Sequence, residues 1–235
     1  MPDPWNNPID DYVPPENQRP FTYKPPDVPL DIVYQDDAIL VLNKPYGLLS
    51  VQGKPLHHKD CLEFRVKDVW PEATAVHRLD HSTSGLILFA MNEALKSEIS
   101  KQFQARTVRK VYRADVWGHV AQDEGVIDVP LRKNWQDSPR QMVCYERGKR
   151  AVTRWKVQSR EAGFTRLELY PETGRTHQLR LHTLHIGHSI LGDELYAPDP
   201  AYEAAPRLLL HACELAFEHP VSGEAVSFTS VPDWM

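Results

Sequence analysis

Hydrophobic and polar positions repeat with two different periods along the chain, and the period changes near residue 110. Before this point the clearest repeat has apolar residues at every fourth position, at Leu95, Ile99 and Phe103. Asn92, a residue type favoured at helix N-caps, precedes them. This pattern predicts an amphipathic helix that begins after Asn92.

A second and shorter helix is expected upstream. Asp60 and Glu63 have the spacing of a capping box, in which two side chains satisfy the first backbone N–H groups of a helix. The apolar positions that follow at helical spacing are Leu62, Val66 and Val69. Pro71 is expected to end this helix.

Strands are predicted where apolar residues run together or alternate. Residues 32–34 and 38–42 form a predicted hairpin, and residues 86–90 a buried strand. After residue 110 the period is two, as in half-buried strands. The alternating positions are Tyr112, Ala114, Val116, Thr153, Trp155, Val157, Thr165, Leu167 and Leu169.

The last predicted elements are a helix over residues 176–186, ended by Gly187, and a closing strand around Val226 and Phe228. Together the elements predict an α+β fold, a mixed but mainly antiparallel sheet flanked by helices and loops. No strand, glycine-rich loop and helix unit typical of a nucleotide cofactor site occurs in the sequence.

Proline separates the first 29 residues from the rest. Nine of the twenty prolines fall there, and a segment so poor in backbone donors and apolar groups does not favour a helix or a central strand. We expect residues 1–29 to be an extended, partly disordered leader. Residues 30–235 are expected to form one domain.

The charge is uneven along the chain. The net charge is −5, which disfavours nucleic acid as a partner, but residues 32–192 hold 24 basic and 18 acidic groups. Residues 101–113 contain five basic groups and no acid. Such a run fits a phosphate-binding surface and equally a solvated face.

The cysteines and the first residues of the sequence indicate the cellular compartment of the protein. The three cysteines are widely spaced and odd in number, which disfavours a disulfide framework and a zinc-binding pair of pairs. The first residues lack the basic and apolar regions of a secretory signal, and no apolar run is long enough to cross a bilayer. A cytoplasmic protein is expected.

The residues with the clearest chemistry lie directly before the buried strand, in a segment that reads His-Arg-Leu-Asp-His-Ser-Thr-Ser-Gly over residues 77–85. Sites are often built at such junctions. The same residues also fit a plain turn, in which the Asp80 carboxylate caps the amides that follow and Arg78 is its surface partner. The spacing alone leaves both interpretations open.

This segment resembles the hallmark of the RluA-type pseudouridine synthases, His-Arg-Leu-Asp followed by Thr-Ser-Gly. Four further segments resemble the family in the expected order, namely residues 43–48, 110–112, 173–180 and 208–212. Some family members carry an additional S4-type RNA-binding domain, and about 30 residues before the domain are too few to form one. The resemblance is therefore to the short form of the family.

The resemblance implies an enzyme that isomerises uridine to pseudouridine in RNA. The short members imply 23S rRNA and the anticodon stem-loop of tRNA as partners, no obligate protein partner and a monomer. The reaction breaks the N1–C1′ bond, turns the uracil and rejoins it through C5, and this chemistry needs neither a cofactor nor a metal. It needs a carboxylate, a cation that orients it and a closed pocket that retains the free uracil.

The resemblance also implies the catalytic roles. Asp80 is the essential carboxylate, Arg180 is the cation that pairs with it, and Tyr112 stacks on the target base and assists proton transfer. On a helix, His177 would share a face with Arg180 and line the same wall. From the residues alone Arg180 could be a surface arginine and Tyr112 a core residue.

RNA contacts follow from the need to extract the target base. A stacked uridine reaches Asp80 only after it flips out, and Arg78 is expected to fill the space that it leaves. Leu209 and Leu210 are expected to be pocket walls, although a plain core role fits them as well. The other residues expected at the RNA are His77, Lys44, Arg106, Arg109, Lys110, Arg113 and His177.

Two rival functions fit parts of the sequence. The histidines at 177, 182, 185 and 188 suggest a zinc hydrolase, but those at 182, 185 and 188 drift across a helix surface and no acidic ligand lies between them. A non-catalytic RNA-binding module would use the same basic surface without needing Asp80. One carboxylate would serve three catalytic routes, by attack at C1′, by attack at C6 or by removal of a sugar proton.

Overall fold

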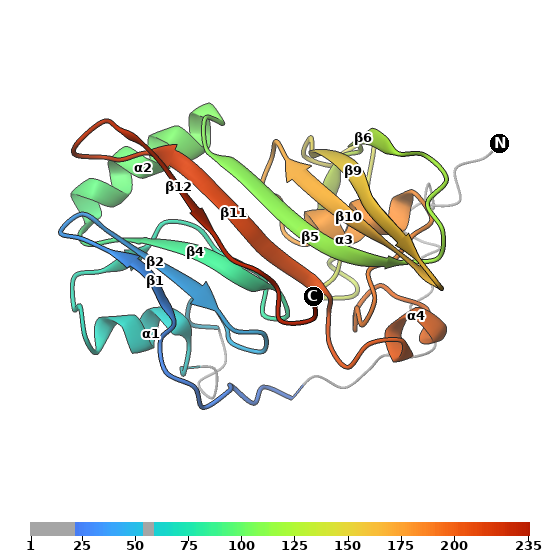
Figure 1. Cartoon of the computed structure of the whole chain (residues 1–235), viewed down its shortest axis with the longest axis horizontal. Coiled ribbons are helices and arrows are strands. Elements are labelled where there is room, and N and C mark those ends of the chain that lie inside the picture. Colours follow the sequence, from blue (N-terminus) through green and yellow to red (C-terminus); the bar gives the residue numbers. More distant parts are fainter. Residues whose placement is uncertain (1–21, 54–58) are drawn as a thin grey trace. The chain divides into compact units, whose positions relative to one another are not determined.

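The computed structural model describes residues 22–53 and 59–235, and its chain divides into two compact units. The first, called here the Asp80 unit, comprises residues 22–113 and 209–235. The second, the Arg180 unit, comprises residues 114–208. Each unit is described by itself, and Figure 1 labels most of the elements of both.

The Asp80 unit is built on a mixed sheet whose strands run in the order β1-β2-β4-β11-β5, with β3 beside β4 and β12 beside β11. Most of the pairings are antiparallel, but β4 and β11 are parallel. The strands are β1 (Ile32–Gln35), β2 (Ile39–Lys44), β3 (Thr74–Ala75), β4 (Ser84–Ala90), β5 (Arg109–Trp117), β11 (Leu210–Glu218) and β12 (Ala225–Thr229).

Both faces of β4 are covered, which explains the uninterrupted apolar run seen in the sequence. Successive side chains of a strand point to opposite faces, so Leu86 and Leu88 enter one hydrophobic cluster while Ile87 and Phe89 enter another. Ile99 of α2 (Glu93–Ala105) packs into the first cluster. Leu62 and Val66 of α1 (Leu62–Lys67) pack into the second, so the two helices cover opposite faces of the sheet.

The predicted helix after Asn92 is confirmed, including its cap: the Asn92 side chain accepts a hydrogen bond from the backbone N–H of Leu95. The predicted capping box of α1 is wrong. The N-cap is Cys61, without a side-chain hydrogen bond, because Asp60 binds Arg65 and Glu63 accepts a bond from the N–H of Ala75. This helix ends at Lys67, before the proline expected to end it.

The Arg180 unit contains the last residues of β5 and the order β5-β10-β9-β6, beside a separate two-stranded sheet of β7 and β8. The predicted alternating strands are confirmed in β5, β9 and β10. The elements are β6 (Glu124–Asp128), β7 (Leu131–Lys133), β8 (Gln141–Val143), β9 (Val152–Glu161), β10 (Phe164–Pro171), α3 (Gln178–His185) and α4 (Asp199–Glu203). The α+β prediction, a mainly antiparallel mixed sheet with few helices, is thus confirmed.

Part of the proline-rich leader lies in the described chain. Residues 22–29 form neither helix nor strand, as their composition indicates. They are nevertheless held against α1, because the Tyr23 hydroxyl donates to the Asp60 carbonyl and Arg65 donates to the carbonyls of Pro26 and Val28. The prediction for residues 1–21 lies outside the described residues. Within the described parts of the chain, none of the helices has the length and apolar character needed to cross a membrane.

Gly85 closes the Thr-Ser-Gly segment of residues 83–85 for a steric reason. Its φ of +109° is one that residues with a side chain rarely adopt. A Cβ placed on Gly85 would lie 2.4 Å from the Ala212 carbonyl oxygen. Ala212 is its partner in the parallel pairing of β4 with β11. Only glycine lets these two backbones approach so closely.

We therefore expect Gly85→Ala to lower the free energy of unfolding by about 2 kcal/mol or more, through strain and a backbone clash together. Gly163→Ala is the matched control, since Gly163 has a φ of +92° with no neighbouring atom within 4 Å of an added Cβ. Urea denaturation of both variants measures the difference. Equal losses would show that the approach of β11 is not what requires glycine.

Candidate active site

The segment that carries Asp80 is a loop between β3 and β4, fixed through its backbone. The Ser50 hydroxyl donates to the Leu79 carbonyl at 2.8 Å and accepts from the Leu79 N–H at 3.0 Å. The Thr83 N–H donates to the Asp80 carbonyl oxygen at 3.1 Å, so the turn uses the backbone of Asp80. Asp80 is partly exposed, and within its own unit the described residues give its carboxylate no hydrogen bond or ion pair. The carboxylate is thus left available for a substrate.

Lys44 stabilises this loop from below. Its side chain is fully buried, and its Nζ donates to the carbonyl oxygens of Pro45 at 2.9 Å, Leu48 at 2.7 Å and His81 at 3.2 Å. A buried ammonium needs such compensation. Here two of the carbonyl groups belong to the segment after β2 and one belongs to the Asp80 loop. The prediction that Lys44 reaches a phosphate conflicts with this burial, and we correct it to a structural role beside Asp80.

Tyr112 lies next to Asp80. Its ring packs against the second hydrophobic cluster, which contains Leu79. Burial raises the pKa of the Tyr112 hydroxyl well above its ordinary value, and the negative charge of Asp80 and the neighbouring Cys213 raise this pKa further. The tyrosine therefore keeps its proton, and it can donate a hydrogen bond but is a weak base.

His77, which was expected at the RNA, is held by contacts within the fold. Its Nε2 accepts a hydrogen bond from the Leu88 N–H at 3.1 Å, and its ring lies against Phe103 with the centroids 5.2 Å apart. Burial, followed by the charge of Lys110, lowers the pKa of His77 to about 3. The imidazole is therefore neutral, and through Nε2 it joins the Asp80 loop to β4. The expected contact of His77 with the RNA stays a prediction.

The predicted basic residues differ in how free they are. The side chains of Arg78 and Arg106 are exposed and have neither a hydrogen bond nor an ion pair to any residue of the described ranges. Arg109 is exposed but lies 3.4 Å from Glu214. Lys110 lies over the Phe103 ring, and burial lowers its pKa. Arg113 donates to the Met235 sulfur. Of the basic residues predicted at the RNA, Arg78 and Arg106 are thus exposed without a partner among the described residues.

A buried histidine that sequence reasoning missed ties the Asp80 loop to the end of the chain. His211, 3% exposed, bonds through Nδ1 to the Ser84 hydroxyl at 2.8 Å and through Nε2 to the Ser230 hydroxyl at 2.9 Å. Ser230 in turn donates to the Asn43 side-chain oxygen at 3.2 Å. The sequence signal was the polar His211 inside the apolar segment 208–212, which was read only for its leucines.

Leu210 begins β11, and Leu209 directly precedes it. Leu210 is buried at 3% exposure and Leu209 is partly buried. Their burial is consistent with a wall or with plain core, so the pocket assignment stays a prediction.

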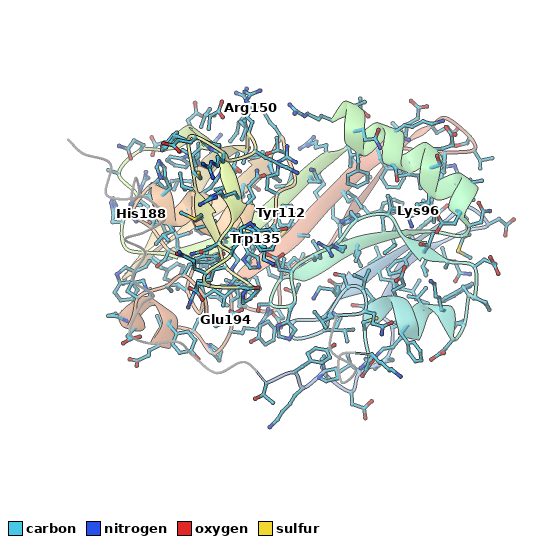
Figure 2. All side chains as sticks on the ribbon, turned by 180° about the vertical axis from the view of Figure 1, so that it is seen from behind. Lys96, Tyr112, Trp135, Arg150, His188 and Glu194 are labelled. Carbon is cyan, nitrogen blue, oxygen red and sulfur yellow. The ribbon has the colours of Figure 1, made fainter. Side chains whose placement is uncertain are left out.

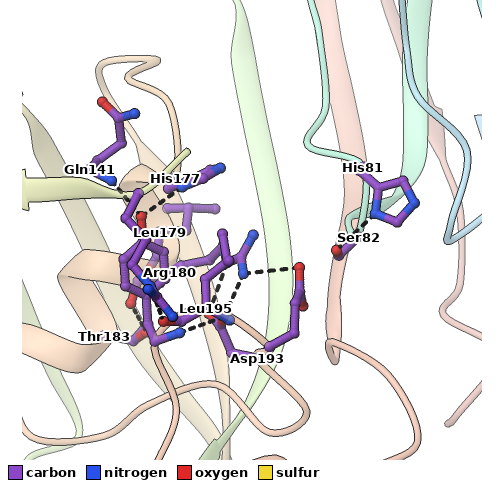
Figure 3. Close-up of polar contacts among 12 residues, drawn as sticks. His81, Ser82, Gln141, His177, Leu179, Arg180, Thr183, Asp193 and Leu195 are labelled. Atoms are coloured by element: carbon purple, nitrogen blue, oxygen red, sulfur yellow. Dashed lines mark hydrogen bonds and ion pairs between the residues drawn. The ribbon is translucent and has the colours of Figure 1, made fainter. Parts of the chain in front are cut away.

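In the Arg180 unit, Arg180 is 2% exposed and is bound by a carboxylate that the sequence did not suggest. Figure 3 shows its contacts with the loop after α3: Nε donates to Asp193 at 2.8 Å and Nη2 at 2.5 Å, and Glu194 lies 3.3 Å from Nη2. Gly192, with a φ of +70°, permits the tight turn, since a Cβ there would meet the Arg207 carbonyl at 1.9 Å.

Asp193 organises this loop through four hydrogen bonds. Besides Arg180, it accepts bonds from the N–H groups of Leu195 at 2.9 Å and Tyr196 at 3.1 Å. Burial alone would raise the pKa of Asp193, but the charge and hydrogen bonds of Arg180 and the two backbone N–H groups outweigh it and lower the pKa. The sequence analysis gave Asp193 no role, whereas it is the internal partner of Arg180.

His177 lies at the N-cap of α3 with a left-handed φ of 54°, outside the helix proper. The predicted shared helix face with Arg180 is therefore wrong. His177 is joined to the same loop in another way, because its Nδ1 lies 2.7 Å from the Tyr196 hydroxyl, which also accepts the Gln141 N–H at 2.8 Å. The Arg180 guanidinium lies over the Tyr196 ring, with its central carbon 5.2 Å from the ring centroid.

Gln178 explains why the segment before α3 turns where it does. Its buried amide donates to the Val152 carbonyl at 3.0 Å, and its oxygen accepts from Thr173 at 2.7 Å and from the Arg175 N–H at 3.0 Å. These bonds fix residues 173–178 on β9 and direct α3 so that Arg180 meets Asp193.

The histidines of the zinc hypothesis serve separate contacts. His182 bonds through Nδ1 to the Thr153 hydroxyl, and His188 through Nδ1 to the Trp117 carbonyl. Among the residues that the structure describes, no group of three histidine, cysteine, aspartate or glutamate side chains could hold a metal ion. The three cysteines are free thiols.

The structure thus brings Asp80 and Tyr112 together in one unit. Arg180 and His177 come together in the other. The ion pair between Asp80 and Arg180, which the resemblance implies, joins residues of different units and stays a prediction.

Comparison with known proteins identifies the family. The RNA pseudouridylate synthase family matches residues 38–185. The chain is 50% identical to the dual-specificity RNA pseudouridine synthase RluA of Vibrio cholerae, over 85% of this chain and 82% of that protein. It is 48% identical to the protein of the same name from Escherichia coli K12, over 90% of this chain and 98% of that one.

A solved structure agrees with this assignment. The structure titled human RNA pseudouridylate synthase domain containing 1 is 28% identical, with a TM-score of 0.71 over 92% of this chain and 87% of that one. Sequence identity over most of the length, a matching family profile and a shared fold lead to one conclusion. The chain belongs to the RluA-type RNA pseudouridine synthases, an isomerase family.

Proposed function

We propose that this enzyme converts uridines in the stem-loops of 23S rRNA and in the anticodon stem-loop of tRNA to pseudouridine, with Asp80 as the essential carboxylate. The observation that carries the catalytic role is the Asp80 loop itself. Its backbone is fixed by Ser50 and Lys44, whereas its carboxylate has no bond within the Asp80 unit and lies beside Tyr112. Such a carboxylate is held in place for a ligand and does not itself stabilise the fold of the unit through hydrogen bonds.

The reaction is balanced without an oxidant or a water molecule. The N1–C1′ bond breaks, the uracil rotates, and C5 forms the new bond to C1′; C5 then loses its proton, and N1 ends with one. Asp80 can attack C1′, attack C6 or remove a sugar proton from one position. All three routes need the carboxylate to be ionised and close to the sugar and base of a sequestered nucleotide.

Tyr112 fits the role of a hydrogen-bonding aromatic beside the base. Its raised pKa keeps the hydroxyl protonated in the free enzyme, so it can donate a hydrogen bond to the bound base and assist removal of the C5 proton late in the cycle. It can stack on the uracil and pass a proton through its hydroxyl, while the nearby Asp80 carboxylate receives it. Arg180 is proposed to pair with Asp80 in the substrate complex, with its own orientation set by Asp193.

The choice of RNA is supported by the relatives and by the exposed cations. The curated relatives above are named dual-specificity RNA pseudouridine synthases, and the chain covers most of their length. Arg78 is exposed two residues before Asp80 and is free to enter the stack when the uridine flips out. Loops are favoured because their bases unstack at least cost. We further propose a cytoplasmic monomer, with residues 30–235 as the catalytic domain after a leader.

The central test is Asp80→Asn, which keeps the size of the side chain and removes its charge. We expect conversion of rRNA and tRNA transcripts to fall at least about thousandfold, with RNA affinity largely retained. Asp37→Asn, an exposed aspartate of the same unit, is the matched control and is expected to act like the wild type. Pseudouridine formation is measured in transcripts and in RNA from cells that lack the gene and carry either variant. Wild-type-like conversion by Asp80→Asn would remove Asp80 from its role.

Arg78→Ala is expected to lower kcat/KM for RNA by about ten- to hundredfold, because nothing then fills the space of the flipped base. Thermal unfolding should not change, since Arg78 is exposed and unpaired in the described chain. Arg106→Ala provides the contrast: as a phosphate contact it should weaken binding modestly, reduce the salt dependence of log Kd by about one and spare kcat. Normal turnover by Arg78→Ala would disprove its role in flipping.

The carboxylate of Asp193 should control both stability and its pH dependence. Asp193→Asn removes the buried carboxylate that binds Arg180 through two hydrogen bonds, so we expect a loss of about 3 kcal/mol in unfolding free energy at pH 7. Because the pKa of Asp193 is lowered in the folded protein, its contribution is present above the ordinary aspartate pKa and lost as the pH falls through the folded value.

Denaturation curves of wild type and Asp193→Asn should therefore converge as the pH is lowered below about 4. Glu194→Gln is the matched control, since Glu194 also contacts Arg180 but is 27% exposed. A gap between the two curves that stays constant down to the lowest pH would contradict this account.

A further inference from the structure

Trp135 is the most exposed large hydrophobic residue of the described chain, with 76% of its surface accessible. It lies in the connection between β7 and β8 of the Arg180 unit and is labelled in Figure 2. The Lys133 ammonium lies 4.2 Å from the centroid of its ring. An indole with a cation on one face presents its other face to solvent, where it can stack on another planar group.

The loop that presents the indole is held by buried polar contacts. Arg140 and Asp137, each 7% exposed, form an ion pair at 2.6 Å. Asn134 is buried as well: its N–H donates to the Arg140 carbonyl at 3.0 Å, and its side-chain oxygen accepts the Gln136 N–H at 3.1 Å. The neighbours of Trp135 on both sides are thus fixed, although Trp135 itself contributes little to the core.

The same hairpin is bound to the loop that holds Arg180. Arg140 Nε donates to the Leu195 carbonyl at 2.7 Å, and the Gln141 N–H donates to the Tyr196 hydroxyl at 2.8 Å. The N–H groups of Leu195 and Tyr196 both bind Asp193, the partner of Arg180. Figure 3 shows this connection from Gln141 to Asp193. A ligand on the hairpin is therefore held at a fixed distance from Arg180.

The charge around the hairpin fits an anionic ligand. The basic side chains of residues 131–150 outnumber the acidic ones by six to two, and one of the two acids, Asp137, is neutralised internally by Arg140. Arg147 and Lys149 are exposed in the segment after β8. A ligand that offers both a planar ring and negative charges is a nucleotide of RNA, which the family modifies.

We propose that Trp135 is a stacking platform for an unpaired base of the RNA substrate, other than the target uridine, and that Lys133, Arg147 and Lys149 bind the phosphates next to that base. The proposal rests on the proposed function, since it assigns a second contact to the same RNA. It gives the Arg180 unit a role in choosing substrates: RNAs with a second unpaired base at the right distance from the target uridine bind more tightly.

The test uses the full chain and two RNA transcripts, an anticodon stem-loop and a 23S rRNA stem-loop. We expect Trp135→Ala to raise Kd and KM for the transcript that stacks by about tenfold and to leave kcat within about twofold, because the lost interaction is made in both ground and transition states. Trp135→Phe should restore most of the affinity, since a smaller ring still stacks. Phe64→Ala is the control, as Phe64 is 55% exposed on α1 in the other unit.

Salt dependence separates stacking from charge. Trp135→Ala should leave the slope of log Kd against log salt unchanged, whereas Lys149→Ala should reduce it by about one. Thermal unfolding of Trp135→Ala should match the wild type, because the indole is mostly exposed. A Kd within about twofold of the wild type for both transcripts would overturn the proposal and would leave a protein partner as the reason for the exposed indole.

The two levels of the proposal fail differently. Wild-type enzyme that converts neither transcript would contradict the proposed substrates, and that outcome is read from pseudouridine formation. The stacking contact is read from Kd, which is measured whether or not conversion occurs. Loss of kcat rather than affinity in Trp135→Ala would also overturn the stacking proposal, since it would show that the residue acts through the reacting groups.

Discussion

The ammonium of Lys44 is fully shielded from water, and the arrangement of the Asp80 loop follows from the need to compensate it. Its three carbonyl partners belong to Pro45, Leu48 and His81, so one charge joins the end of β2 to the residue after Asp80. Three carbonyl dipoles stabilise one cation well only when all three point at it. This requirement fixes the segments that carry the carbonyl groups. The loop is therefore ordered without using the Asp80 carboxylate, which stays available for the reaction.

The Arg180 unit meets the opposite requirement. Here the functional group is a cation, and the chain neutralises it with a buried carboxylate before any substrate is present. Asp193 orients Arg180 through two hydrogen bonds, and its carboxylate also accepts hydrogen bonds from the N–H groups of Leu195 and Tyr196. In both units, then, a buried charge of one sign fixes a short loop, and the residue proposed to act on the RNA is positioned by it.

Sequence patterns predicted the elements well and the side-chain partners poorly. The helix after Asn92, the first hairpin and the alternating strands followed from local periodicity, which depends on residues close in the chain. The capping box failed because Asp60 and Glu63 found other partners, one of them Ala75 on a neighbouring strand. Lys44 was misassigned for the same reason, because backbone carbonyl groups bind its buried ammonium. A polar side chain near a motif is easily predicted to bind a ligand. Only the folded structure shows that backbone groups of another segment already bind it.

The motif residues themselves were found by resemblance, whereas their supports were not. Neither Asp193 nor His211 was predicted to have a role, although His211 stands beside the two leucines that were. Both are buried polar residues whose partners lie on segments brought close only by folding: His211 bonds to Ser84, 127 residues earlier in the chain. No pattern within a short window contains such a pair.

A net acidic chain that binds RNA must concentrate its positive charge, and internal ion pairs decide where. At least eleven of the described lysines and arginines are paired with a carboxylate of the chain. These cations add little to the field outside, because a neighbouring carboxylate cancels each of them beyond a few ångströms. The attraction for phosphate then depends on the exposed cations without such partners. Arg78 and Arg106 belong to the Asp80 unit, and Arg147 and Lys149 to the Arg180 unit. Each unit therefore contributes such cations to the attraction for phosphate, whatever the total charge of the chain.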